Sequence, residues 1–157
     1  MILNRLSECV QELHDMDNPI ILRPETMGKP GLIGSLEDVL YLARNIDGVK
    51  PCLDFPHIHA RSGGTSHNSY ESWSKLLTIY GKSLGNDALS DLHIHMSGIK
   101  YSTKGELKHL PLRDSDFDVL SLFKALKYFN CKGRILCESP ILEEDALYMQ
   151  ALWETIQ

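Results

Sequence analysis

Acidic and histidine side chains stand at the ends of short apolar runs in this sequence. Four such runs each deliver one side chain of a type that binds metal ions, namely Glu25, Asp54, His93 and Glu138. Three carboxylates converging in one buried pocket repel one another and cannot all stay ionised without a cation among them. Carboxylate oxygens combined with imidazole nitrogens suit zinc, manganese or iron better than calcium or magnesium. The pattern therefore predicts a divalent-metal site.

Further candidate ligands for a second ion follow these positions closely in the sequence: His57, His59, His95, Glu106 and His109. Two histidines at i and i+2 of one strand have Cα atoms roughly 6.6 Å apart, which is close enough to serve neighbouring metals. For His59, His67 and His95 a structural role is the preferred interpretation, since a single buried histidine is more often a hydrogen-bonded core residue.

Alternating strand and helix patterns position these side chains. Strands are predicted at 20–22, 52–54, 89–96 and 134–137, each followed by a helix, at 35–46, 70–84, 117–129 and 142–156, and a helix at 2–15 precedes them all. Loops are expected after Asp54, up to Gly64, and from Gly98 to Asp114. Successive strand-helix units predict a parallel sheet with right-handed crossovers, which is an α/β fold of the TIM-barrel kind. Such barrels place polar ligands at the carboxyl ends of their strands.

The length indicates a single domain over residues 1–157 that amounts to about half of such a barrel, because eight units need roughly 250 residues. Half of a barrel exposes sheet edges and an apolar interior, which proteins avoid. We therefore expect a partner that completes the barrel: an N-terminal half-barrel or a second copy in a homo-oligomer.

Composition favours a soluble cytoplasmic protein. The chain is 43% hydrophobic and 24% charged, and its four cysteines form no C-x-x-C pair, which indicates a reducing compartment. No signal peptide and no apolar run of membrane-spanning length is recognisable, so no membrane association is expected. A net charge of −5 argues mildly against a generic nucleic-acid binder. Basic residues nevertheless follow the predicted strands: Lys29, Arg61, Lys100, Lys104, Lys108 and Arg113. A basic rim and an ordinary solvated surface both remain open as interpretations of these side chains.

Several motifs resemble one known family. They are Glu25-Thr26, Cys52-Leu53-Asp54-x-x-His57, Leu92-His93, His109-Leu110 and Leu136-Cys137-Glu138-Ser139-Pro140. In this order and spacing they resemble the C-terminal half of endonuclease IV, the zinc-dependent apurinic endonuclease of the xylose isomerase-like TIM-barrel superfamily. The resemblance covers essentially the whole chain.

This resemblance implies a cluster of two or three zinc ions, with manganese also possible. Glu25 would bridge two ions, Asp54, His93 and Glu138 would complete one site, and His57 would belong to another. Glu106 and His109 are carried over as further ligands, and Glu25 and Glu138 are expected to act in catalysis. The implied reaction is cleavage of damaged double-stranded DNA on the 5′ side of an abasic site, as in DNA repair.

Two other functions remain open. A sugar isomerase or epimerase of the same superfamily holds one or two divalent ions in a similar set of ligands, and a non-catalytic half-barrel subunit would complete its barrel by assembly. His57 and His109 favour the endonuclease, because additional histidines have a role in a multi-metal cluster and little role in a single-metal isomerase.

Overall fold

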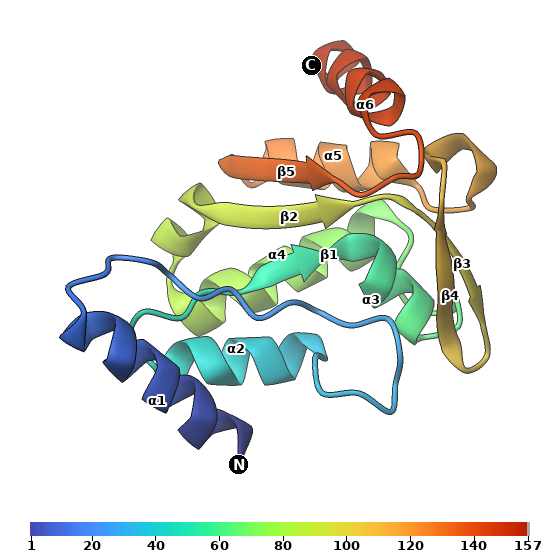
Figure 1. The fold of residues 1–157 in the computed structure, drawn as a ribbon. Coiled ribbons are helices and arrows are strands. Elements are labelled where there is room, and N and C mark those ends of the chain that lie inside the picture. The colour runs from blue at the N-terminus through green and yellow to red at the C-terminus, as the bar shows by residue number, and fades with distance from the viewer. Residues whose placement is uncertain (157) are drawn as a thin grey trace.

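The structure is a computed structural model that describes residues 1–156 (Figure 1). Its helices are α1 (Ile2–Asp15), α2 (Leu36–Asn45), α3 (Phe55–Arg61), α4 (Tyr70–Leu84), α5 (Val119–Tyr128) and α6 (Glu143–Thr155), with short 3-10 helices at Asn86–Ser90 and Leu112–Asp114. Its strands are β1 (Cys52–Asp54), β2 (Leu92–Met96), β3 (Gly98–Ser102), β4 (Gly105–Leu110) and β5 (Gly133–Cys137).

The main sheet has the strand order β1-β2-β5, and all its pairs are parallel. The prediction of a parallel α/β sheet is therefore confirmed. The strand predicted at 20–22 is instead part of an extended segment without regular strand pairing. This segment makes two isolated parallel bridges, one from Leu22 to Val49, which precedes β1, and one from Glu25 to Cys52 in β1. It still brings Glu25 to the edge of the sheet beside β1.

Burial in β2 alternates along the strand. Leu92, Ile94 and Met96 are buried, whereas His93 and His95 are only partly buried on the opposite face. Figure 1 shows α4 and α5 behind the sheet, and the apolar β2 side chains belong to the same core cluster as the residues of these helices. The sheet therefore turns its apolar face to the helices and its histidines to the other side, because successive side chains of a strand point to opposite faces.

Two segments expected to be loops are regular structure. Residues Phe55–Arg61 form α3 because Pro56 suits the first helical turn and the Asp54 carboxylate caps it, accepting a hydrogen bond of 2.6 Å from the backbone N–H of His57. Residues 98–110 form the antiparallel hairpin β3-β4. Its turn ends at Gly105, whose φ of +96° is a conformation that favours glycine.

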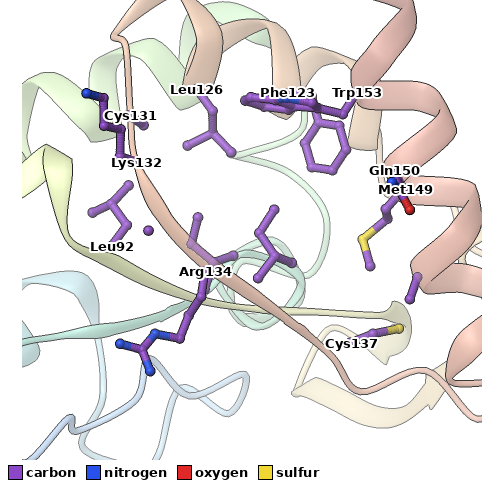
Figure 2. A pocket seen from close by; sticks show the side chains of 14 residues that line it. Leu92, Phe123, Leu126, Cys131, Lys132, Arg134, Cys137, Met149, Gln150 and Trp153 are labelled. Atoms are coloured by element: carbon purple, nitrogen blue, oxygen red, sulfur yellow. The ribbon is translucent and has the colours of Figure 1, made fainter.

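The outer edge of β5 has no neighbouring strand among the described residues. Ile135 and Leu136 are 38% and 51% exposed there. A cavity of about 540 Å³ lies between β2, β5, α5 and α6, with Phe123, Met149 and Trp153 among its lining residues (Figure 2). The described chain thus leaves apolar surface open beside its last strand.

Within residues 1–156, no helix has both the length and the apolar character that crossing a bilayer would require. A cytoplasmic location stays a prediction.

Candidate metal centre

The carboxyl ends of β1, β2 and β5 meet at one edge of the sheet, and strand register decides which side chains come together there. Asp54 at the end of β1 is in register with His95 of β2. Glu138 follows β5 directly, and its backbone N–H donates to the carbonyl of Met96. With Glu25 from the neighbouring extended segment, these residues form one group of potential ligands, Glu25, Asp54, His95 and Glu138, whose donor atoms all lie within 4.8 Å of one another.

His95 lies between two carboxylates of this group. Its Nδ1 is 3.4 Å from Oε1 of Glu25 and 3.2 Å from Oε1 of Glu138. Glu25 Oε1 is also 3.2 Å from Nδ1 of His57. Glu25 therefore contacts histidines from both β2 and α3, which is the position a bridging ligand would occupy.

A second group of potential ligands, Asp54, His57 and His109, adjoins the first and shares Asp54 with it. Nδ1 of His57 is 3.0 Å from the carbonyl oxygen of Thr26, and Nδ1 of His109 is 3.1 Å from that of Glu138. A carbonyl oxygen only accepts, so each of these Nδ1 atoms carries the proton and donates. This arrangement leaves both Nε2 atoms to face each other, and they are only 3.3 Å apart. Two lone pairs at that distance need a shared proton or a cation between them.

Glu106 of β4 completes this side of the centre. Its Oε2 is 3.4 Å from Nε2 of His57, so the hairpin supplies a carboxylate next to the two facing nitrogens. The structure thus brings together six of the seven residues that the sequence nominated as ligands: Glu25, Asp54, His57, Glu106, His109 and Glu138.

His93 is the nominated residue that lies elsewhere. Register pairs it with Cys52 instead of Asp54, because it sits two residues before His95 on the same face of β2. His93 therefore groups with Cys52 and His95, and His95 takes the place beside the carboxylates. The alternation of β2 identified the correct face, but the sequence does not reveal how far neighbouring strands extend past one another.

Two buried atoms in the centre lack a hydrogen-bond partner among the described residues. Asp54 has no exposed surface, and only its Oδ1 accepts a hydrogen bond, from His57; its Oδ2 and Nδ1 of His95 are left unpaired. Leaving a buried polar atom unpaired costs about 1–3 kcal/mol. Because both atoms are good metal donors, the residues present fit a divalent cation.

Without a cation, the centre retains protons. Burial raises the pKa of Asp54 to about 8, with Glu25 and Glu138 adding to the effect and His57 opposing it. Burial would lower the pKa of His57, but the hydrogen bond to Glu25 and the charges of Asp54 and Glu106 raise it to about 9. Burial likewise opposes ionisation of Glu25, yet His57 and His95 outweigh it and lower its pKa. A protonated His57 therefore supplies positive charge among the carboxylates when no metal is bound.

His59 and His67 lie outside the metal centre, in keeping with the structural role preferred from the sequence. His59 is buried, its Nδ1 donates to the carbonyl of His67 at 2.7 Å, and its Nε2 is 3.3 Å from the Asp116 carboxylate. Tyr101 of β3 donates to the same carboxylate. These contacts hold the hairpin against α3.

Comparison with known proteins agrees with this architecture. The family described as xylose isomerase-like TIM barrel matches residues 1–153. Uncharacterized protein MJ0133 of Methanocaldococcus jannaschii is 40% identical over 157 residues, which cover 98% of this chain and 57% of that protein. The chain thus spans a little over half the length of this curated relative.

A solved structure, "The crystal structure of AsfvAP:AG", is similar with a TM-score of 0.55 at 16% identity, over 85% of this chain and 50% of that one. At this identity the similarity concerns the fold alone. The parallel sheet, the potential ligands at its carboxyl edge and the match over nearly the full length lead to one conclusion. The chain belongs to the xylose isomerase-like TIM barrel family.

Proposed function

We propose that this chain forms the metal-binding part of an endonuclease IV-like phosphodiesterase, which cleaves damaged double-stranded DNA on the 5′ side of abasic sites and uses zinc. The observation that carries the proposal is the pair of facing Nε2 atoms of His57 and His109, 3.3 Å apart, next to a separate group of carboxylates. Two adjoining ligand groups suit a cluster of ions better than a single ion. Clusters of this kind hold both the attacking and the leaving oxygen of a phosphodiester.

The two groups of potential ligands would bind different ions. Asp54, His95 and Glu138 would hold one ion, His57 and His109 another, and Glu25 contacts histidines of both. Bound zinc would lower the pKa of a coordinated water towards neutrality and neutralise charge on the phosphate oxygens. Thr26 and the Glu138 backbone orient His57 and His109 through their Nδ1 atoms, so that Nε2 points into the centre.

Exposed lysines lie on two neighbouring segments, one of which carries Glu106. The backbone N–H of Glu106 in β4 donates to the carbonyl of Gly28, so the 27–34 loop and the hairpin lie side by side. Lys29 on the loop and Lys104 and Lys108 on the hairpin are exposed. Such side chains neutralise phosphates and position a nucleic-acid backbone, which supports a DNA substrate. Arg61 does not contribute in this way, because its guanidinium donates to backbone carbonyls of the same loop, including those of Met27 and Leu32.

The second candidate is a divalent-metal sugar isomerase or epimerase. The group Glu25, Asp54, His95 and Glu138 would suffice for a single ion of that kind. His57, His109 and Glu106 argue against it, because a single-metal isomerase gives these three adjoining side chains no ligand role.

The test is a nicking assay with the zinc-loaded protein on duplex DNA that contains one abasic site. We expect cleavage on the 5′ side of the lesion, and a loss of at least about a hundredfold in Glu25→Gln, because that substitution removes the shared ligand charge. Glu143→Gln, an exposed change at the start of α6, is the matched control and should cleave normally. Interconversion of sugars by a protein that leaves abasic DNA intact would support the isomerase instead.

A further inference from the structure

Beside the carboxylate centre, a third group of potential ligands contains sulfur. Donor atoms of Cys52, His93 and His95 all lie within 4.8 Å of one another. Cys52 and His93 are register partners on the adjacent parallel strands β1 and β2, and His95 is the next residue on the same face of β2. The group therefore rests on two hydrogen-bonded strands, which fix its spacing more firmly than loops would.

We infer that Cys52, His93 and His95 form a binding site for a thiophilic metal ion, such as Zn(II), Cd(II) or Cu(I). This inference goes beyond the proposed phosphodiesterase and holds whichever reaction the carboxylate centre performs.

The donor atoms of this site are free to bind. Cys52 is only 2% exposed, and no hydrogen bond joins its sulfur to another residue in the range 1–156. Neither ring nitrogen of His93 hydrogen-bonds to a described residue, although its ring lies against that of His95 with centroids 5.2 Å apart. The thiol of Cys52 and the ring of His93 can therefore change from packing to ligation without losing a hydrogen bond to a described residue.

The spacing matches a metal site before the metal enters. Metal–nitrogen and zinc–sulfur bonds of about 2.0–2.3 Å place tetrahedral ligands roughly 3.5 Å apart. A triangle no wider than 4.8 Å therefore needs side-chain movements of only about 1 Å. Three ligands leave the fourth tetrahedral position to water or to another group.

Ligand chemistry separates this site from its neighbour. A thiolate with two imidazoles prefers soft ions, whereas the carboxylate-rich group next to it also accepts harder ions such as manganese. His95 belongs to both groups: its Nδ1 lies near Glu25 and Glu138, and an imidazole has a second nitrogen to offer. Occupation of the sulfur site would therefore fix the ring that the carboxylate centre also uses.

Cobalt(II) titration of the metal-free protein tests this site, because a thiolate bound to cobalt gives a charge-transfer absorption in the near ultraviolet that oxygen and nitrogen ligands do not. We expect the band in the wild-type chain and in Asp54→Asn, which disrupts the carboxylate centre but leaves all three ligands of the sulfur site. Cys131→Ser is the matched control, since Cys131 is a partly buried thiol outside the group, and it should keep the band.

Two variants decide the outcome. The band should vanish in Cys52→Ser, and in His93→Ala the cobalt affinity read from it should fall at least about tenfold. Absence of the band in the wild type, or its survival in Cys52→Ser, would overturn the inference. Should Cys52→Ser not fold, as judged by circular dichroism, His93→Ala decides alone, and an unchanged cobalt affinity there contradicts the site.

Discussion

Asp54 performs three tasks at once. Its Oδ1 caps α3, its Oδ2 is a buried acceptor without a hydrogen-bond partner among residues 1–156, and it belongs to both groups of potential ligands. The cap directs His57 into the centre, because His57 lies in the helical turn that the carboxylate begins. One side chain therefore couples the local fold to the chemistry.

Metal binding should release protons and strengthen as pH rises. The pKa of Asp54 is raised to about 8 and that of His57 to about 9, so both side chains hold protons at pH 7 that a cation must displace. We expect zinc affinity to increase with pH up to about 9 and then level off. Calorimetry in two buffers of different ionisation enthalpy measures the released protons, and a pH-independent affinity would contradict the assignment.

The same raised pKa values predict how the metal-free protein responds to pH. The pKa of each group in the folded chain lies above its ordinary value, which is 3.8 for Asp54 and 6.5 for His57. Each group therefore binds its proton more tightly in the folded chain than in the unfolded chain, and this binding stabilises the fold fully at a pH below the ordinary pKa. This stabilisation is lost as pH rises through about 8 for Asp54 and 9 for His57. The urea midpoint of the metal-free chain should therefore fall between pH 7 and 9, and a midpoint that rises over this range would disprove it.

Substitution separates the roles of the two histidines of β2. His95→Ala should weaken manganese binding at least about tenfold, because it removes a ligand from the carboxylate group. His93→Ala should change the manganese affinity by no more than about twofold, since the register partner of His93 is Cys52 and a thiolate is a poor ligand for manganese. Manganese titration followed by electron paramagnetic resonance measures both affinities. A larger loss of affinity in His93→Ala than in His95→Ala would contradict the assignment of His95 to the carboxylate group.

At the scale of elements, the sequence predicted the helices and strands that show a local periodic pattern of apolar residues. The helix expected at 70–84 is confirmed as α4. The strand expected at 89–96 begins only at Leu92, because Asn86–Ser90 form a 3-10 helix, but its alternating burial is a local pattern. Ser35 and Asp38 form a capping box at the start of α2, which is another local pattern. Residues 98–110 were expected to be a loop but form a hairpin. The sequence did not reveal it, because the hairpin depends on tertiary contacts such as the hydrogen bond from Tyr101 to Asp116. The position of His95 was missed for a related reason, since register is a property of two strands together.

The contact between the 27–34 loop and β4 holds Glu106 beside His57. A Cβ at Gly28 would lie 2.6 Å from Cβ of Glu106, so Gly28→Ala must displace that side chain. We expect it to weaken zinc binding at the His57 and His109 group by several-fold. Gly31→Ala is the matched control in the same loop, because a Cβ there meets nothing within 4 Å. Equal zinc affinities for the two variants, measured by competition with a chelating dye, would rule out a ligand role for Glu106.

At the scale of the whole molecule, the described chain is an open sheet. Leu136 of the outer strand β5 is in register with His95 and is 51% exposed. The cavity shown in Figure 2 also borders β5, and its lining includes Arg134 and Cys137. The opposite edge exposes Ile20 and Ile21. Closed barrels leave no such edges, which is why we propose that an N-terminal half-barrel or a second copy of the chain covers them.

The isolated chain should therefore have a mass above that of a monomer in light scattering. Leu136→Lys should shift it towards monomer by placing a charge on the open edge, while Tyr41→Lys, an exposed aromatic on α2, should not. A well-behaved monomer with a cooperative thermal transition would contradict the need for a partner.

The central claim is that the facing histidines and the carboxylate group hold more than one ion, and elemental analysis of protein purified without chelator tests it most directly. The Cys52→Ser variant should be used, so that sulfur-bound metal is not counted. We predict more than one zinc ion per chain, with part of the metal lost in His109→Ala and the rest retained. A single ion per chain that His109→Ala leaves in place would contradict the account and favour the isomerase.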